Sequence, residues 1–384
     1  MKNKIFLIFL TFSLYACNLP ASTPTPDLLA TLSASTPIPA DSNPLPTIPV
    51  SSNGEPIGKI AYTCQIFKAQ ASNQICIINA DGSGFRRLTV DNTKQHYYPS
   101  VAPDGLSVVY AAFREPNIYE IYEVNIASGV ITQLTDRLGN LNSPEISPNG
   151  NTIVFKLSTP SANQLWLMNR DGTNPRQIPN VTGWDPTWSP DGNKILFASD
   201  MNEAIQLYTV NVDGSELLKI SNLPAIRGRS DWSPDSSFIV TYSGQPWNRD
   251  VYIMNADMNE AIQLYTVNVD GSELLKISNL PAIRGRSDWS PDSSFIVTYS
   301  GQPWNRDVYI MNADGTNTRM LSPTGGNSQG PSISPDGGWV AFTSYFDQYR
   351  VDNGCEIYIM RVDGTDVRRL TNNDYCDYQP RWGP

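Results

Sequence analysis

Hydrophobic residues from about position 59 onward fall into short runs, many of which alternate with polar residues. In the stretch that begins at Pro186, residues 194–198 (KILFA) are apolar and residues 206–211 (QLYTVN) alternate between polar and apolar. Short apolar runs and two-residue alternation are typical of buried and half-buried β-strands. We therefore predict four short strands in this stretch, at residues 187–189, 194–198, 206–211 and 217–221.

Two turn motifs separate these predicted strands. Pro190-Asp191-Gly192 follows the first strand, and residues 212–215 (VDGS) join the third strand to the fourth. Asp-Gly supplies the positive φ that tight hairpins need. We therefore interpret the aspartates in such turns as turn residues rather than as calcium ligands or catalytic groups.

The two motifs recur along the chain about every 44 residues. The first motif has its inner proline at Pro103, Pro148, Pro190, Pro234, Pro291 and Pro335, and the second lies at Asp81, Ser128, Asp171, Asp213, Asp270, Asp314 and Asp363. A four-stranded unit of this size cannot bury both of its faces alone, and radial stacking of several units solves that problem. The repeat predicts an all-β fold, a β-propeller of four-stranded blades.

These motifs resemble the PD40, or WD40-like, repeat of TolB-type β-propellers. Residues 357–371 (IYIMRVDGTDVRRLT), followed by a Pro-x-Trp strand, carry the resemblance, which runs from about residue 58 to 384. It implies protein partners in the periplasm or envelope. TolB proteins also carry an amino-terminal α/β domain that this chain replaces with a Pro-rich segment, so the resemblance does not transfer their Tol-Pal partner.

The two ends of the repeat region predict a closed ring. The first unit enters at its second strand, residues 59–63, without the proline-containing segment that opens the other units. Residues 379–384 (QPRWGP) resemble that missing segment. We predict that they form a strand that completes the first blade and buries Trp382.

An internal duplication sets the blade count. Residues 200–257 and 257–314 are identical, which raises the count from six units to seven, and the sequence leaves open whether the duplication is recent or an assembly error. The blade between Pro234 and Pro291 has two candidate third strands, residues 251–257 and 262–270. A blade needs an even number of strands, and the second candidate leads into an Asp-Gly turn. We predict that it is the third strand, that residues 251–260 form an enlarged loop, and that residues 308–314 form a regular strand.

The amino terminus predicts export. Lys2 and Lys4 precede an apolar run at residues 5–14, which is shorter than the roughly 20 residues that span a bilayer, and Cys17 follows a small residue as in a bacterial lipobox. We predict a signal peptide at residues 1–17 and lipidation of Cys17. The protein would then be a membrane-anchored lipoprotein at the cell envelope, either periplasmic or on the cell surface. The alternative is an ordinary signal peptide with an incidental Cys. Residues 18–57, rich in Pro, Ser and Thr, predict a disordered linker to the propeller at residues 58–384.

Charge and residue inventory argue against several functions. The net charge of -10, with no basic cluster, argues against nucleic-acid binding. His96 is the single histidine, which excludes a His-based zinc cluster and most nucleophile triads, and the sequence has no Gly-x-Ser-x-Gly or phosphate-loop motif. Asp185, Asp231 and Asp288 lie beside predicted inner strands, where strand-end capping is the simpler interpretation than acid catalysis. We predict no enzyme activity, no cofactor and no metal.

Four further cysteines are disulfide candidates because an exported protein meets oxidising conditions. Cys64 and Cys76 lie in the second and third strands of the first unit, and Cys355 and Cys376 flank the outer half of the last unit. We expect pairing of Cys64 with Cys76 and of Cys355 with Cys376. Free thiols, or cross-pairing between the first and last units, are the alternatives.

Aromatic and arginine side chains concentrate in the loops between the second and third strands and between blades. Such residue types are enriched at binding hot spots, although many of them could pack between blades instead. The candidates are Tyr97, Tyr98, Trp184, Trp247, Arg249, Trp304, Arg306, Tyr345, Tyr349 and Tyr378. We predict a monomeric, non-enzymatic scaffold that binds an envelope protein or a glycan through this face. A polysaccharide-binding or polysaccharide-active surface protein is the alternative.

Overall fold

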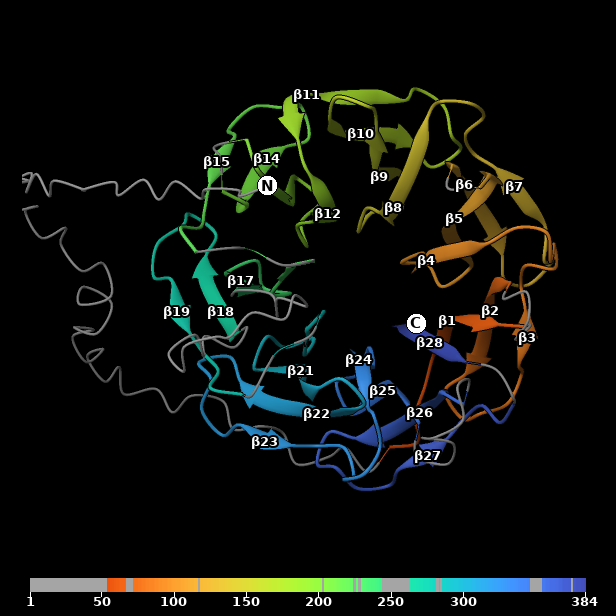
Figure 1. Cartoon of the computed structure of the whole chain (residues 1–384), viewed down its shortest axis with the longest axis vertical. Coiled ribbons are helices and arrows are strands. Elements are labelled where there is room, and N and C mark those ends of the chain that lie inside the picture. Colours follow the sequence, from red (N-terminus) through yellow and green to blue (C-terminus); the bar gives the residue numbers. More distant parts are fainter. Residues whose placement is uncertain are drawn as a thin grey trace, which may run out of the picture. The chain divides into compact units, whose positions relative to one another are not determined.

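The computed structural model describes residues 54–66, 72–116, 118–201, 204–223, 226, 229–243, 263–280, 283, 285–345, 354–373 and 376–384. These residues form seven four-stranded antiparallel sheets, which surround a common centre in Figure 1 and confirm the predicted seven-bladed β-propeller. Cys17 and most of the expected linker lie outside the described residues. Within the described ranges, no helix is long and apolar enough to cross a membrane.

Each blade is an antiparallel meander, numbered here from the innermost strand outward. The strands of blades 1 to 4 are as follows: blade 1, β28 (Asp377–Gly383), β1 (Lys59–Gln65), β2 (Asn73–Asn79) and β3 (Arg86–Arg87); blade 2, β4 (His96–Val101), β5 (Ser107–Glu115), β6 (Ile118–Asn125) and β7 (Ile131–Gln133); blade 3, β8 (Asn140–Ile146), β9 (Thr152–Ser158), β10 (Asn163–Asn169) and β11 (Arg176–Thr182); blade 4, β12 (Trp184–Trp188), β13 (Lys194–Ser199), β14 (Gln206–Asn211) and β15 (Leu218–Lys219).

Blades 5 to 7 follow the same order. Their strands are: blade 5, β16 (Asp231–Trp232), β17 (Phe238–Ser243), β18 (Gln263–Asn268) and β19 (Leu275–Lys276); blade 6, β20 (Asp288–Trp289), β21 (Phe295–Gln302), β22 (Asn305–Asn312) and β23 (Arg319–Met320); blade 7, β24 (Gln329–Ile333), β25 (Trp339–Ser344), β26 (Glu356–Arg361) and β27 (Arg368–Arg369).

Asp-Gly turns close the hairpins between third and fourth strands. In blade 4, Asp213 Oδ1 accepts hydrogen bonds from the backbone N–H of Ser215 at 2.9 Å and from its hydroxyl at 2.6 Å. Gly214 has a φ of +88°, and a Cβ there would lie 2.7 Å from Pro179 Cδ. The aspartates therefore stabilise turns, as the sequence predicts.

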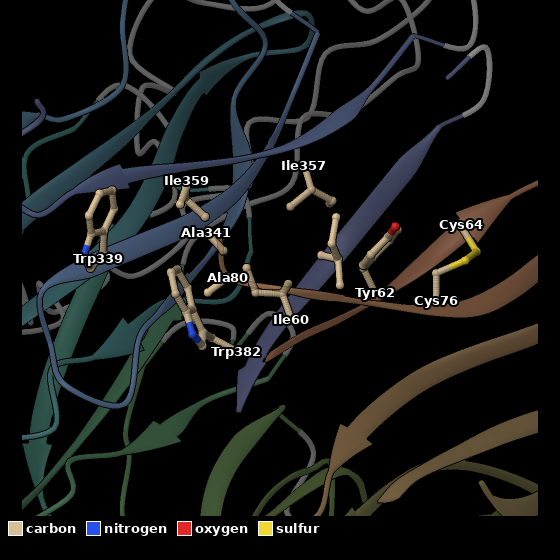
Figure 2. Packing of buried hydrophobic residues seen from close by; sticks show 11 residues of the cluster. Ile60, Tyr62, Cys64, Cys76, Ala80, Trp339, Ala341, Ile357, Ile359 and Trp382 are labelled. Carbon is tan, nitrogen blue, oxygen red and sulfur yellow. A yellow bond between two sulfur atoms is a disulfide. The ribbon is translucent and has the colours of Figure 1, made fainter. Parts of the chain in front are cut away.

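The carboxy-terminal strand closes the ring. β28 pairs antiparallel with β1, with Trp382 opposite Ile60, and thereby supplies the innermost strand of blade 1. The Trp382 indole packs in the cluster of Figure 2 between blades 1 and 7, and its Nε1 donates a hydrogen bond to the Ile57 carbonyl at 2.7 Å. Both the closure and the burial of Trp382, which is 9% exposed, are confirmed. The described chain begins at Gly54, inside the expected linker, and the Gly54 carbonyl accepts a hydrogen bond from Trp339 Nε1 at 3.2 Å.

The duplicated segment folds in the predicted register. In blade 5, β17 pairs with β18, so residues 263–268 form the third strand. In blade 6, β21 pairs with β22, which includes Val308 and ends at Asn312. Both third-strand predictions are confirmed. Residues 251–260 lie outside the described part of the chain, and their enlarged loop stays a prediction.

Candidate functional site

The meander topology gives the propeller two unlike faces. Connections between second and third strands emerge on the same side as connections between blades, and we call this side the loop face. Turns between first and second strands and between third and fourth strands emerge on the opposite face. The loop face carries the longer connections and therefore most of the candidate binding residues.

Seven aromatic residues form an arc on the loop face that spans blades 6, 7, 1 and 2. Phe113 and Tyr119 meet edge-on with ring centroids 4.6 Å apart, and Trp304 meets Tyr345 edge-on at 5.7 Å. Tyr98 is 44% exposed and Trp304 is 55% exposed. We define the aromatic arc as Tyr97, Tyr98, Phe113, Tyr119, Trp304, Tyr345 and Tyr378.

Neighbouring groups fix the arc in place. The Asn73 side-chain amide donates a hydrogen bond to the Tyr97 hydroxyl at 2.6 Å. Burial raises the pKa of Tyr378, with smaller contributions from Tyr97 and other tyrosines of the arc, and burial likewise raises the pKa of Tyr119 to about 12. The arc is therefore a packed and uncharged surface.

Two disulfides lie on the same side of the molecule. Cys64 of β1 is bonded to Cys76 of β2, with their Cα atoms 5.9 Å apart. Cys355 is bonded to Cys376, with Cα atoms 4.4 Å apart, and the Tyr345 hydroxyl lies 3.7 Å from Cys376 Sγ. The second disulfide links the last blade directly to the residue before the closing strand β28.

A buried carboxylate follows this disulfide. Asp377 is the first residue of β28 and is 1% exposed. Its backbone N–H donates to the Cys355 carbonyl at 2.8 Å, and its Oδ2 accepts from the Asn373 amide at 2.7 Å. Burial, together with the nearby Glu356 carboxylate, raises the pKa of Asp377 to about 7. The join between the chain ends therefore contains a group that titrates near neutrality.

A cavity of about 400 Å³ occupies the centre of the ring, lined by residues from blades 1 to 6. We call it the central cavity. The ionisable side chains that line it are Tyr98, Glu145, Asp185, Arg229, Tyr242, Arg286 and Arg381. Tyr98 belongs to both the aromatic arc and the cavity lining, so the two features are continuous.

Most blades present an Xaa-Pro bulge to this centre. In five blades the innermost strand contains a residue that precedes a proline and has a positive φ of 52 to 62°. These residues are Tyr98, Ser143, Asp185, Gly330 and Gln379. The duplicated blades 5 and 6 have Arg229-Ser230 and Arg286-Ser287 at this position instead. The duplication therefore placed two arginines side by side in a ring whose other blades carry no arginine at this position.

Carboxylates pair with two of the cavity arginines. Arg229 donates to Glu145 of blade 3, and Arg286 Nε donates to Asp231 of blade 5 at 2.7 Å. Asp288 instead accepts from the backbone N–H of Ile333 at 2.9 Å. Among the described residues, the Arg381 guanidinium makes one hydrogen bond, to the Pro380 carbonyl at 3.1 Å, and has no carboxylate partner.

Burial and like charges perturb these groups. Burial, followed by the nearby Arg286 and Arg229, holds the pKa of Arg381 well below its ordinary value. Burial also raises the pKa of Asp185 and of Asp288. The centre of the ring is therefore desolvated, and Arg381 lies near two other cations as well as near Asp288 and Asp231, which act on its pKa in the opposite direction.

The other candidate residues lie in three kinds of place. Trp184 packs partly buried against the hydrophobic cluster between blades 4 and 5, outside the aromatic arc. Arg306 donates to Gln329 Oε1 at 2.5 Å on the loop face. Trp247, Arg249 and Tyr349 lie outside the described residues.

His96 and the acidic residues form no metal-binding group within the ranges described. No set of three or more His, Cys, Asp or Glu side chains gathers there in a way that could hold a metal ion. His96 is buried with Nδ1 3.0 Å from the Asn73 carbonyl, and burial lowers its pKa to about 4. It is therefore a neutral hydrogen-bonding group of the fold at neutral pH.

Sequence reasoning missed the three cavity arginines and two residues of the aromatic arc, Phe113 and Tyr119. Arg229 and Arg286 precede the Trp of the repeat motif by three residues, and Arg381 precedes its Trp by one. Aligning the seven first strands on this motif would have brought all three to the ring centre. Tyr119 lies at an ordinary third-strand position, and no signal in the sequence marks it.

Solved structures share this fold at low sequence identity. TolB from Acinetobacter baumannii superposes with a TM-score of 0.55 at 20% identity, covering 86% of this chain and 68% of that one. The β-propeller domain of the Trilobed protease from Pyrococcus furiosus, described as having an open velcro topology, gives 0.60 at 15% identity, covering 84% and 95%. An oligogalacturonate lyase in complex with manganese gives 0.57 at 16% identity, covering 83% and 87%. These likenesses show the fold alone.

Sequence comparison is more specific. The chain is 37% identical over 116 residues to an uncharacterized protein of Agrobacterium fabrum, a match that covers 30% of this chain and 36% of that protein. The family model of the TolB beta propeller domain (PD40) matches residues 52–273 and 259–384. Since these two matches span the repeat region, and its seven blades have the expected topology, the chain belongs to the TolB β-propeller domain family.

Proposed function

We propose that this protein is a non-enzymatic binding module of the cell envelope that docks a protein partner on its loop face. The aromatic arc is the observation that carries the proposal. It presents exposed Tyr98 and Trp304 on a surface whose other rings are fixed by packing, and large aromatic side chains of this kind supply much of the energy at protein interfaces.

The geometry of the arc favours a protein over a glycan. Its ring pairs Phe113–Tyr119 and Trp304–Tyr345 meet edge-on, so each pair covers part of a ring face. A sugar that stacks on an aromatic ring needs an open face, whereas a protein surface can fill the uneven spaces between tilted rings. Glycan binding is the rival function.

A binding role also fits the chemistry of the centre. Among the described residues, carboxylates engage two of the three cavity arginines, Arg229 through Glu145 and Arg286 through Asp231, and His96 is buried in blade 2. Propellers similar to this one include a lyase and a domain of a protease, so the fold by itself decides nothing about catalysis. The proposal of no enzyme activity rests on the residues.

Export and anchoring form the second part of the proposal. The apolar leader, the lipobox-like Cys17 and the Pro-rich segment together suit a lipoprotein whose propeller is held away from the membrane. Replacing Cys17 with Ser should give an uncleaved or freely soluble product. Unchanged detergent partitioning of the C17S protein would contradict the anchor.

Partner capture tests the binding function. The immobilised propeller should retain a protein from envelope extracts, and the double variant Tyr98→Ser/Trp304→Ser should lose it. The matched control is Phe85→Ser/Leu106→Ser, which removes two side chains that are 59% and 61% exposed on the opposite face. Capture that survives the arc variant would contradict docking on the loop face, and binding on a glycan array without protein capture would favour the rival.

A further inference from the structure

We propose that the central cavity binds a carboxylate of an acidic protein segment that enters from the loop face. This inference deepens the proposed function, because it names the chemistry of the partner at the mouth of the ring. Arg381 is the residue on which it depends. Its guanidinium lines the cavity from the closing strand β28 and has no carboxylate partner among the described residues.

The charge on the cavity wall is uneven. Three guanidiniums line the cavity, whereas Asp231 and Asp288, the acidic residues of the neighbouring strands, do not line it. Of the two lining carboxylates, Glu145 is engaged by Arg229, and burial raises the pKa of Asp185 towards its neutral form. The side chains of the wall therefore offer more positive than negative charge to whatever enters.

Hydrogen-bonding capacity is also unused there. Arg229 Nε is buried without a hydrogen-bond partner, and Arg381 uses one of its five N–H donors. Burial and the adjacent Arg286 and Arg229 disfavour the charged form of Arg381. An entering carboxylate would satisfy these donors and offset the repulsion between the cations.

Access and selectivity follow from the surroundings. Tyr98 lies both in the aromatic arc and on the cavity wall, so a segment docked on the arc can extend a side chain or a terminus inward. The whole chain carries a net charge of -10, which opposes non-specific binding of acidic polymers. We therefore expect an acidic group to be attracted to the cavity rather than to the surface as a whole.

Short peptides test the site directly. We expect the blocked tetrapeptide Ac-Glu-Glu-Glu-Glu-NH2 to bind the purified propeller by isothermal titration calorimetry, and Ac-Gln-Gln-Gln-Gln-NH2 not to bind. Arg381→Gln should weaken tetraglutamate binding by about tenfold or more, and Arg381→Lys should restore part of it. The matched control is Arg176→Gln, which removes one exposed arginine from the outer strand β11 of blade 3.

Several results would overturn the inference. Equal binding of the glutamate and glutamine peptides, or equal loss in the Arg381→Gln and Arg176→Gln proteins, would exclude a carboxylate site at Arg381. Binding of trigalacturonate without binding of tetraglutamate would reassign the cavity to acidic glycans. Thermal melts of each variant identify a loss of peptide binding that arises from unfolding. Arg286→Lys keeps the charge beside Asp231 and is a second variant for the comparison of peptide binding.

The captured partner separates this inference from the proposed function. If Arg381→Gln leaves capture from envelope extracts unchanged while the arc variant Tyr98→Ser/Trp304→Ser abolishes it, the carboxylate site is wrong and loop-face docking stands. If both variants abolish capture, both proposals are supported. If neither does, both are wrong.

Discussion

Blades 5 and 6 have identical first and second strands but different third strands. β17 and β21 both begin with FIVTYS, yet β17 pairs with QLYTVN in β18 and β21 pairs with DVYIMN within β22. Both partners place an apolar residue opposite the same isoleucine, Val267 opposite Ile239 and Met311 opposite Ile296. A blade therefore needs a partner strand with the right alternation and register rather than one particular sequence.

Blades 4 and 5 have the converse relationship, because their third and fourth strands are identical in sequence and their second strands differ. Their outer halves are copies, and each copy repeats its internal hydrogen bonds: Gln206 donates to the Leu223 carbonyl at 2.6 Å, and Gln263 to the Leu280 carbonyl at 2.7 Å. The second strands to which these halves pair have different sequences. Inner and outer halves of a blade thus behave as separable modules, which explains how a duplication that breaks within a blade still yields seven complete sheets.

Packing against the next blade is where the two copies differ. Phe295 is 1% exposed and packs in a cluster with Val362 of blade 7, whereas its copy Phe238 is 37% exposed. The position equivalent to Val362 in blade 6 is Ala313, which has a shorter side chain. The environment of a duplicated residue is therefore set by its neighbouring blade.

The largest effect should come from removing a strand altogether. Deleting residues 379–384 takes most of β28 from blade 1 and removes Trp382 from the interface with blade 7. If each strand of a blade requires a partner strand in register, complete loss of that partner should abolish the cooperative thermal transition of the propeller. An unchanged melting temperature of the truncated protein would contradict ring closure.

Paired alanine variants measure the difference between the two copies. Phe295→Ala should lower the free energy of unfolding by about 3 to 5 kcal/mol, because it leaves a cavity in a filled cluster. Phe238→Ala should cost less than about 1.5 kcal/mol, since much of that ring is already in solvent. Equal losses in chemical denaturation would show that the neighbouring blade does not set the environment of the copies.

The buried carboxylate of blade 1 sharpens the comparison, because blade 1 pairs β28 with β1, two strands that are far apart in the sequence. Asp377 has a pKa of about 7 in the folded protein, against an ordinary value of 3.8. Its protonated form favours folding, so the contribution is complete below about pH 4 and is lost as the pH rises through 7. Asp377→Asn should therefore match the native protein near pH 4 and exceed its unfolding free energy at pH 8 by about 2 to 4 kcal/mol.

Denaturation curves at the two pH values check this prediction. The control is Asp104→Asn, which changes an exposed carboxylate whose pKa is lowered chiefly by its hydrogen bond from Arg170. A lowered pKa means that the charged form favours folding, so the control should lose stability at pH 8, the opposite sign. A pH dependence shared by native protein and Asp377→Asn would exclude Asp377 as its source.

The smallest effect should come from shortening the surplus segment of blade 5. Deleting residues 249–258 leaves β17 and β18 intact and should change the free energy of unfolding by less than about 1 kcal/mol. The contrasting variant lacks residues 306–312, which form most of β22, the third strand of blade 6. This deletion should unfold the protein. If deletion of residues 249–258 unfolded the protein, residues 251–257 would have to belong to the hydrogen-bonded sheet of blade 5.

Local patterns were sufficient to predict the blades, their number and the closing strand. Strand alternation and Asp-Gly turns act over a few residues, so each unit specifies itself, and the first unit is recognisably one strand short. The cavity could not be predicted in this way, because the direction of Arg229 and the missing partner of Arg381 depend on which strands the closed ring brings together. Trp184 shows the same limit, since residue type alone does not separate a ring on the loop face from one packed between blades 4 and 5.

Site-specific photo-crosslinking in cells tests the central claim, docking of a protein on the loop face, most directly. A photoreactive phenylalanine analogue would replace Tyr98 or Trp304 in the aromatic arc, and Phe85 or Leu106 on the opposite face. Binding through the arc predicts that positions 98 and 304 form a shared protein adduct and that positions 85 and 106 do not. Adducts only from positions 85 and 106, or from none of the four, would contradict it.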